Sequence, residues 1–400
     1  MRKILCFVMI TALLIGAAAC GGNGTESSAP AGSGETAATT ATTTAVSEES
    51  GAPTTAEGTA IAGTSAPATT VTTAARSVTK STATTAKTTA KPTTTTTVSK
   101  EQYFADKEKI TVSGSESDPR TWVYTLGKNG VRVREVTFDS GKGGEPAEIV
   151  QISDIHFNTV NVQDMIEDNP SLMATYVQRF GSFPGSKDNL NRCMEYAGYF
   201  DQIVITGDAI DYLSYGNLEL LQQRVWDRAP TALVALGNHD AVRCMGLPND
   251  VADPTTLESR YAILQGAWKH NIFYTSRVVK NKAMVIQLDN GFGQFRHEQI
   301  AQLEADLATA REKHYVVLLF YHVPLATNGV ATGSEDNRKV YELITNNADV
   351  IRGAFCGHEH VNQYGEIKAK TKSGQNAVIP QYVLETVASY AGAVLKITVK

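Results

Sequence analysis

Short apolar runs alternate with helix-like patterns in this sequence from residue 122 onward. Alternating apolar residues at 122–137 predict leading strands, and residues 188–200, 218–225, 299–310 and 339–344 carry apolar side chains at helical spacing. Mostly apolar runs predict further strands at 148–153, 202–206, 231–236, 283–288, 315–321, 350–356, 382–387 and 394–399. Because strands alternate with helices in the middle and are paired at the ends, the pattern predicts an α/β fold with a mixed sheet or two sheets.

The first 19 residues are typical of a secretory signal peptide. A basic start (Arg2, Lys3) precedes an apolar stretch and small residues. The stretch is too short for a confident membrane span. The small residues before Cys20 and the glycines after it resemble the bacterial lipoprotein signal, in which the cysteine becomes the lipidated N-terminus. We expect a lipid anchor at Cys20 on the extracellular side of the membrane. Simple cleavage and secretion is the alternative.

Residues 20–102 are expected to form a disordered tether. They consist largely of Thr, Ala, Ser and Gly, so they cannot bury enough apolar surface to offset the entropy of ordering. A flexible chain of this length spans roughly 50 Å root-mean-square. The predicted organisation is therefore a signal peptide at 1–19, a tether at 20–102 and one folded domain at 103–400.

Charge and cysteine content exclude two classes of protein. The formal net charge is only −5 and no long basic run is present, so nothing indicates nucleic-acid binding. Of the five cysteines, Cys6 lies in the signal peptide and Cys20 at the expected anchor. The other three, Cys193, Cys244 and Cys356, have neither metal-site spacing nor the even number of a disulfide framework, and we expect buried thiols.

Metal-ligating residue types follow five of the predicted strands. Ligands of α/β sheets bind beyond the carboxyl ends of the strands, so these residues are expected to converge. Three of the eight histidines, His270, His297 and His314, lie elsewhere and are expected to be solvated or structural. The five strand-end segments are Asp154-Ile155-His156, Gly207-Asp208, Gly237-Asn238-His239-Asp240, His322 and Gly357-His358-Glu359-His360.

This ordered set, D-x-H, G-D, G-N-H-D, H and G-H-x-H, resembles the calcineurin-like metallophosphoesterase family over roughly residues 150–400. The resemblance implies a four-layer α/β/β/α sandwich of two mixed sheets flanked by helices, with two divalent metals side by side at the sheet edge. It also implies catalytic roles for His239 and its partner Asp240. By resemblance, Asp154, His156 and His360 bind one metal, Asn238, His322 and His358 bind the other, and Asp208 bridges them.

The chemistry explains why such residues are needed. Two cations, typically about 3.5–4 Å apart, neutralise a phosphate ester and lower the pKa of a bridging water, which supplies hydroxide. His239 can protonate the leaving alkoxide, and Asp240 would hold its tautomer. A mixed nitrogen and oxygen ligand set without cysteine disfavours a structural zinc site. It suits Mn, Fe, Zn or Co and does not choose among them.

One departure concerns residue 211. The purple acid phosphatase branch has a tyrosine ligand three residues after the bridging aspartate and a glycine in place of the first histidine. Here Asp211 occupies that position and His156 is present, so a tyrosinate–iron site is not expected. We expect Asp211 to be a helix N-cap, with an acid that supports the metal ligands as the alternative.

Substrate choice is expected to lie in three long loops, 157–187, 241–270 and 325–338. The first contains Tyr176, Phe180 and Phe183, and the second contains Arg243 and Arg260. These aromatic and arginine side chains would suit a nucleotide, although ordinary packing is the favoured interpretation.

The predicted function is hydrolysis of phosphodiesters or phosphomonoesters outside the cell, on a small-molecule ester. A catalytically inactive, surface-tethered binding module on the same fold is one alternative. Hydrolysis of another bond, such as a pyrophosphate linkage, at the same site is the other.

Overall fold

The computed structural model describes residues 100, 125–126, 131–167, 169–243, 256–328, 334–388 and 392–400. The expected signal peptide, Cys20, all of the tether except Lys100, and Cys244 lie outside these residues. Within them, no helix is both long and apolar enough to cross a bilayer. Cys193 and Cys356 are free and buried, as expected.

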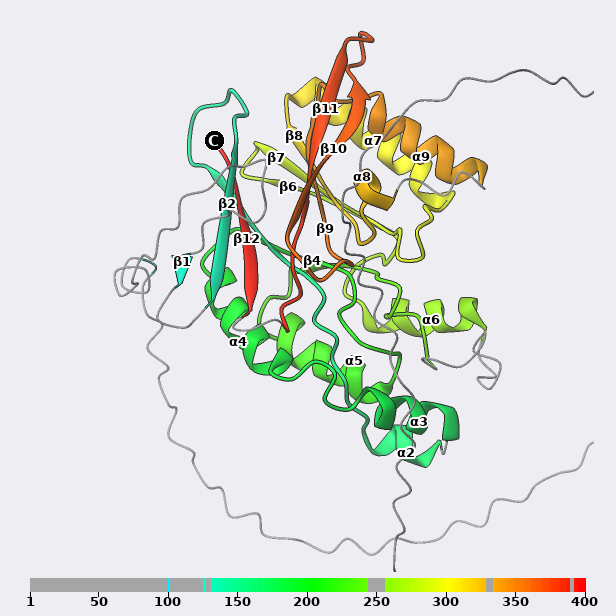
Figure 1. The fold of residues 1–400 in the computed structure, drawn as a ribbon. Helices are drawn as coiled ribbons and strands as arrows, with labels where there is room; N and C mark the ends of the chain where they lie inside the picture. The colour runs from blue at the N-terminus through cyan, green and yellow to red at the C-terminus, as the bar shows by residue number, and fades with distance from the viewer. Residues whose placement is uncertain are drawn as a thin grey trace, which may run out of the picture. The chain divides into compact units, whose positions relative to one another are not determined.

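Two six-stranded sheets form the centre of the domain (Figure 1). The first sheet has, in spatial order, β1 (Thr125–Leu126), β2 (Arg132–Phe138), β12 (Ala393–Val399), β3 (Ala147–Ile152), β4 (Gln202–Thr206) and β5 (Leu233–Ala235). The second has β10 (Gln363–Lys370), β11 (Asn376–Val383), β9 (Ile351–Cys356), β8 (Val316–Phe320), β7 (Ala283–Leu288) and β6 (Tyr274–Val279).

The central strands of each sheet are parallel to one another, and this arrangement positions the site. Strands β3, β4 and β5 are parallel, as are β7, β8, β9 and β11. Strand β12 is antiparallel to β3 but parallel to β2, and β6 and β10 are antiparallel edge strands, so both sheets are mixed. The polar residues that follow β3, β4 and β5 therefore leave one edge of their sheet, and those that follow β8 and β9 leave one edge of the other.

Alternation of side chains along the strands creates separate apolar layers. In β4, Val204 packs between the two sheets, where it joins Ile149, Leu318 and Phe355. Its neighbours Ile203 and Ile205 point to the other face, into a cluster with Leu190 and other helix residues. Strands with both faces covered need apolar residues at nearly every position, which is why they read as continuous apolar runs.

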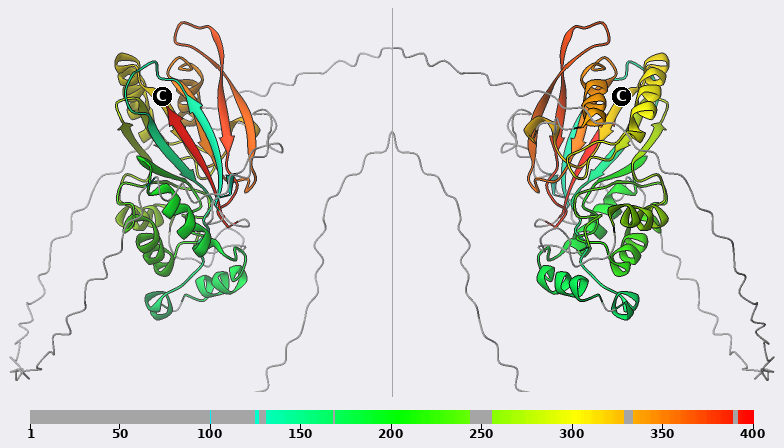
Figure 2. Two further views of the ribbon diagram at one scale, coloured as in Figure 1. Left: turned by 90° about the vertical axis from the view of Figure 1, so that its left-hand side faces the viewer. Right: turned by 90° about the vertical axis from the view of Figure 1, so that its right-hand side faces the viewer.

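Helices cover the outer face of each sheet (Figures 1 and 2). The first sheet packs against α4 (Ser186–Ala197), α5 (Tyr215–Leu221) with its π-helical continuation η2 (Gln222–Trp226), and α6 (Leu257–Ala267). The second sheet packs against α7 (Glu298–Lys313) and α9 (Glu335–Thr345). The predicted four-layer α/β/β/α sandwich is confirmed.

The apolar pattern of the sequence did not predict two of the observed strands, β6 and β10. Both β6 and β10 lie at a sheet edge and expose side chains on one face, as the charged residues of the Gln363–Lys370 segment show. The run predicted at 382–387 also begins earlier, because β11 covers Asn376–Val383 and residues 384–387 leave the sheet. An exposed edge strand needs few apolar residues, so the apolar pattern is weak there.

The prediction of three long loops is wrong, because helices lie within each. Helices α2 (Val162–Ile166) and α3 (Pro170–Arg179) occupy the first, α6 lies in the second, and α8 (Leu325–Asn328) and the start of α9 lie in the third. Their N-caps are readable in the sequence: the side chain of Asn169 accepts hydrogen bonds from two backbone N–H groups and is followed by Pro170. Thr256 caps α6, where its side chain accepts one hydrogen bond, from the N–H of Ser259.

Candidate metal centre

Three groups of histidines and acids converge beyond the strand ends. Within each group, one potential ligand atom per residue lies within 4.8 Å of the others. The segments after β3, β4, β5, β8 and β9 therefore meet, as the parallel strands require. The groups are Asp154, His156, Asp208 and His360; Asp208, His322 and His358; and His156, Asp211 and His239.

In the first group, ring nitrogens and carboxylate oxygens face one another. His156 Nε2 lies 2.9 Å from His360 Nε2 and 3.6 Å from Asp208 Oδ2. The Nδ1–H of His156 donates to Asp211 Oδ1 at 3.0 Å. Because this bond keeps the proton on Nδ1, the lone pair of Nε2 points into the group, as it does in metal-binding histidines.

The second group repeats this arrangement. The Nδ1–H of His322 donates to the carbonyl of Thr206 at 2.9 Å, which directs the Nε2 lone pair inward. That nitrogen lies 3.3 Å from Asp208 Oδ2 and 3.0 Å from Asn238 Oδ1. Asn238 Oδ1 is also 3.0 Å from His358 Nδ1. One oxygen of Asp208 thus lies between the two groups.

The backbone at these residues is strained. Among the described residues, eight non-glycine residues have positive φ, and five of them belong to these groups. Such conformations are costly for L-residues and concentrate at functional sites. The five are Asp154 (52°), His156 (52°), Asp208 (48°), His358 (74°) and His360 (57°).

Two glycines allow the ligand-bearing loops to approach each other. A Cβ at Gly237 would overlap Asp208 Oδ1, and a Cβ at Gly357 would overlap the side chains of Ser153 and Asp154. Any larger residue would move a carboxylate out of the centre. The absence of a side chain at these two positions therefore lets the backbone lie close to the ligands.

The donor set fits divalent cations. Asp154 and Asp208 are buried, with 0% and 1% of their surfaces exposed, and buried carboxylates require positive partners. Burial would raise the pKa of Asp208, but His322 and His156 lower it, so this group stays ionised. The Nε2 lone pairs of His156 and His322 lie 3.6 and 3.3 Å from Asp208 Oδ2, an arrangement that bound cations stabilise.

The expected pairing of His239 with Asp240 is wrong. The Nδ1–H of His239 contacts Asp211 instead, at 3.0 Å from both the backbone carbonyl and Oδ1. The carboxylate of Asp240 is buried beneath the loop and accepts N–H groups of Ile210 (2.9 Å) and Gly237 (2.7 Å). Adjacent residues of this tight loop point in different directions, so sequence adjacency did not reveal the partner.

Asp211 is also not a helix N-cap, since Ser214 caps α5. The alternative interpretation, an acid that supports the metal ligands, agrees with its contacts: one carboxylate holds Nδ1 of both His156 and His239. Burial would raise the pKa of Asp211, but His156, His239 and Arg179 lower it.

Arg179, at the end of α3, was missed by the sequence analysis. It donates from Nε to Asp211 Oδ2 and from Nη2 to Asp211 Oδ1, each at 2.7 Å. No sequence signal links two residues so far apart; only the shared long segment between motifs suggested that this region contributes to the site.

The aromatic residues of the same region divide into two places. Phe183 stacks on His156 with ring centroids 4.1 Å apart and planes within 4°, while Tyr176 and Phe180 pack edge to face at 5.8 Å. Arg243 forms an ion pair with Glu167 at 2.8 Å, and Arg260 is buried. These contacts agree with packing, the favoured interpretation, and place Phe183 alone of the three against a histidine of the centre.

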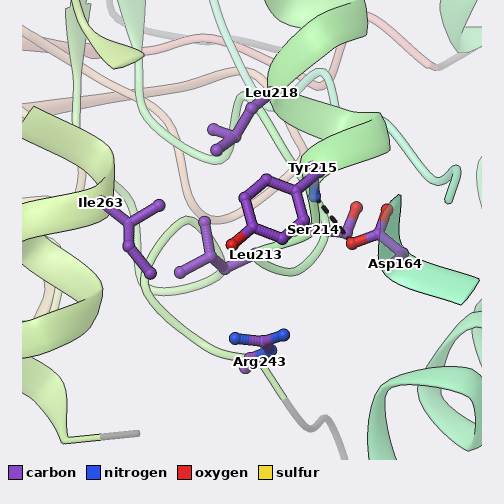
Figure 3. Close-up of a pocket in the computed structure, with 7 residues that line it drawn as sticks. All are labelled: Asp164, Leu213, Ser214, Tyr215, Leu218, Arg243 and Ile263. Carbon is purple, nitrogen blue, oxygen red and sulfur yellow. Dashed lines mark hydrogen bonds between the residues drawn. The ribbon is translucent and has the colours of Figure 1, made fainter. Parts of the chain in front are cut away.

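A small pocket, with a cavity volume of about 10 Å³, lies where α2, α5 and α6 approach one another (Figure 3). Figure 3 shows the Tyr215 ring among apolar side chains, with Asp164 and Arg243 at its edges. Asp164 accepts N–H groups of Asn161, Tyr215 and Gly216, each at 2.9 Å. The carboxylate of Asp164 therefore joins α2 to α5 through these three hydrogen bonds.

Comparison with known families decides the identity of the fold. The family model of calcineurin-like phosphoesterases matches residues 147–362, more than half of the chain. The chain belongs to the calcineurin-like phosphoesterase family. It is accordingly a metal-dependent phosphoester hydrolase, and the family's dinuclear centre corresponds to the histidine and aspartate groups described above.

Solved structures resemble the calcineurin-like domain only distantly. A dimetal phosphatase from Danio rerio is 14% identical, with 60% of this chain and 88% of that chain covered and a TM-score of 0.36. A purple acid phosphatase from yellow lupin (Lupinus luteus) seeds is 12% identical, with 69% and 48% covered and a TM-score of 0.37. A 5'-nucleotidase from Candida albicans is 10% identical, with 60% and 45% covered and a TM-score of 0.30. No curated protein sequence gave a significant match.

Proposed function

We propose that this calcineurin-like domain hydrolyses small phosphate esters at a centre of two divalent metals. Asp154, His156 and His360 would bind one metal, Asn238, His322 and His358 the other, with Asp208 between them. The observation that carries this proposal is the position of Asp208 Oδ2, which lies 3.6 Å from His156 Nε2 and 3.3 Å from His322 Nε2. A carboxylate in that position suits two cations, because its charge screens their repulsion.

Two divalent cations supply positive charge that neutralises the phosphate and activates water. His239 is the proton donor for the leaving alkoxide, since it lies beside the ligand groups and its side chain is 14% exposed. Asp211 holds a proton of His239 on Nδ1, so Nε2 is the nitrogen that can donate to the leaving group. Burial would lower the pKa of His239, but Asp211 and Asp208 raise it, which favours the protonated form that donates.

Phe183 stacks on His156 and helps to hold its ring in place. Its ring covers one face of the imidazole, which limits rotation of the ligand and keeps water from that face. Asp211 fixes the same imidazole through Nδ1. The two contacts together restrain His156 in the orientation that metal binding requires.

The setting outside the cell is part of the proposal. It is supported by the signal-like sequence at residues 1–19 and by the small residues around Cys20, which suit a lipid anchor. The 20–102 segment would then act as a tether between the membrane and the domain. A substrate outside the cell would be a small monoester or diester, with a nucleotide among the candidates.

A complete set of seven ligand-type residues favours an enzyme over the inactive binding module: six lie in two converging groups that share Asp208, and Asn238 contacts His322 and His358. The test is hydrolysis of bis(p-nitrophenyl) phosphate and p-nitrophenyl phosphate by the full chain, stripped by chelator and resupplied with Mn, Fe, Zn or Co. We expect chelator-sensitive turnover with a preference for one ester. Asp208→Asn should lose turnover and bound metal. Unchanged activity in Asp208→Asn, or neither metal nor turnover in the native chain, would contradict the proposal.

A further inference from the structure

Exposed apolar side chains gather on two helices of the domain. Among the described residues, nine large hydrophobic side chains are exposed, and five of them lie within residues 162–180. We name this set the α2–α3 apolar surface: Val162 (70% exposed), Met165 (57%), Ile166 (69%), Val177 (70%) and Phe180 (72%). Scattered exposed hydrophobic residues are ordinary, but a concentration of this kind marks an interaction site.

Helical spacing places these residues on shared faces. Val162, Met165 and Ile166 are spaced three and four apart along α2, and Val177 and Phe180 are three apart at the end of α3. The inward side of the same helices is used for packing, since Leu172 and Asp164 are buried. Figures 1 and 2 show α2 and α3 beyond α5, at the end of the domain remote from β10 and β11.

The charged groups that the structure describes in these helices and at the end of α2 are paired within the domain. Asp164 is bonded to three backbone N–H groups, Glu167 to Arg243 at 2.8 Å, and Arg179 to Asp211. A partner could therefore cover the apolar side chains without removing an unpaired charge from water, which would be costly. Among the described residues of α2 and α3, no basic cluster is present that would select an acidic partner.

The α2–α3 apolar surface is continuous along the chain with two residues that contact the metal centre. Phe180 follows Arg179, which bonds Asp211, and three residues later Phe183 stacks on His156. The residues that bear the surface at the end of α3 are therefore joined along the chain to residues that contact the centre. This continuity connects the surface to the reaction rather than to a remote function.

We propose that the α2–α3 apolar surface docks on a lipid surface and presents the metal centre to phosphate esters there. This inference rests on the proposed function, including the anchor at Cys20, because a tether of roughly 50 Å keeps the domain within reach of the lipid to which it is attached. Two short helices with apolar outer faces suit insertion at a lipid interface. Because their charges are paired internally, apolar contact supplies the binding, and salt weakens it little.

The test is co-sedimentation of the full chain with phosphatidylcholine vesicles. All variants carry Cys20→Ser, so that no acyl anchor contributes. The double variant Ile166→Gln/Val177→Gln removes two side chains of the surface. The matched control Val278→Gln/Val378→Gln alters two exposed valines of β6 and β11, which are 48% and 52% exposed. We expect vesicle affinity to fall at least about tenfold in the first variant and to stay unchanged in the control.

Hydrolysis of p-nitrophenyl esters in solution separates this inference from the proposed function. Neither pair of substitutions touches the centre, so turnover should remain in both variants. Equal vesicle binding by the two double variants would overturn lipid docking. Loss of a dimer in Ile166→Gln/Val177→Gln, measured by sedimentation without vesicles and with no effect on vesicle binding, would assign the surface to a second copy and also overturn it.

Discussion

Arg179 and Asp211 are joined by two parallel hydrogen bonds of 2.7 Å each. The carboxylate that receives them also holds Nδ1 of His156 and of His239. Helix α3 therefore orients, through one acid, a proposed metal ligand and the proposed proton donor. The link explains how a segment inserted between β3 and α4 takes part in the chemistry without contributing a ligand.

Replacing Arg179 should lower turnover. Arg179→Ala frees the Asp211 carboxylate to rotate, and we expect kcat to fall by about 10–100-fold with little change in KM. Arg179→Lys keeps the charge but not the two-bond fork, so an intermediate loss is expected. Steady-state kinetics on a p-nitrophenyl ester measures both constants.

The control for Arg179 is Arg243→Ala, which breaks the ion pair with Glu167 on the neighbouring helix. It should leave kcat nearly unchanged. If both substitutions reduce kcat equally, the loss comes from disorder of α2 and α3 and not from the orientation of Asp211.

Substitution of the two acids near His239 should affect different properties: kcat for Asp211 and the free energy of unfolding for Asp240. Asp211→Asn removes the negative charge beside His239 and His156, and we expect kcat to fall by about 10–100-fold with the folded state retained. Asp240→Asn leaves His239 alone but places an amide N–H₂ against one of the two backbone N–H groups of Ile210 and Gly237. We expect it to lower the free energy of unfolding by about 1–3 kcal/mol.

Urea unfolding and kinetics on the same two variants check this contrast. A large loss of kcat with unchanged stability in Asp240→Asn would restore the pairing expected from the sequence and refute the assignment to Asp211.

Removal of metal should destabilise the domain. The ligands come from loops after five strands of two sheets, so a cation bound by them stabilises only the folded state. At free metal 100-fold above its dissociation constant this stabilisation is about 2.7 kcal/mol per site, and we expect the thermal midpoint to fall by several degrees on chelation. Scanning calorimetry with and without chelator measures the shift.

In Asp208→Asn the same chelation should change the thermal midpoint little. An equal shift in this variant would place the stabilising cation elsewhere in the chain.

His270 should make stability depend on pH, apart from the metal centre. Its Nε2 accepts the N–H of Val234 at 2.9 Å while its Nδ1–H donates to the Asn271 carbonyl. The bond from Val234 needs the neutral ring, because protonated Nε2 cannot accept a hydrogen bond. Burial, together with the nearby Arg277, lowers the pKa of His270 to about 4 from its ordinary 6.5.

The sign of the effect follows from these values. The unfolded chain takes up the proton first as the pH falls, so the contribution of His270 is complete above about pH 6.5 and is lost as the pH falls toward 4. We expect a loss of about 2–3 kcal/mol in the free energy of unfolding over that interval. His270→Gln should remove this part of the pH dependence, whereas His297→Gln, at a side chain that is 76% exposed, should leave it intact.

The sequence alone determined the central strands and the order of the ligand motifs. A strand such as β4 must be apolar at nearly every position because both of its faces are covered, so its run is visible locally. Asp208 and His322 follow such runs directly, and parallel strands bring their ends together. The alternation of elements predicted an α/β fold with a mixed sheet or two sheets, and the resemblance to the calcineurin-like family implied the two-sheet sandwich.

Only the tertiary structure decided which residues support the ligands. Asp240 is adjacent to His239 in sequence, yet its carboxylate turns toward the backbone, and Asp211 reaches His239 from a different loop. Arg179 reaches Asp211 from a helix that the sequence analysis assigned to a loop. Such contacts depend on the direction of each side chain in a packed loop and on the path of an inserted segment. Neither is encoded in apolar periodicity, because polar contacts across the fold leave no repeat in the sequence.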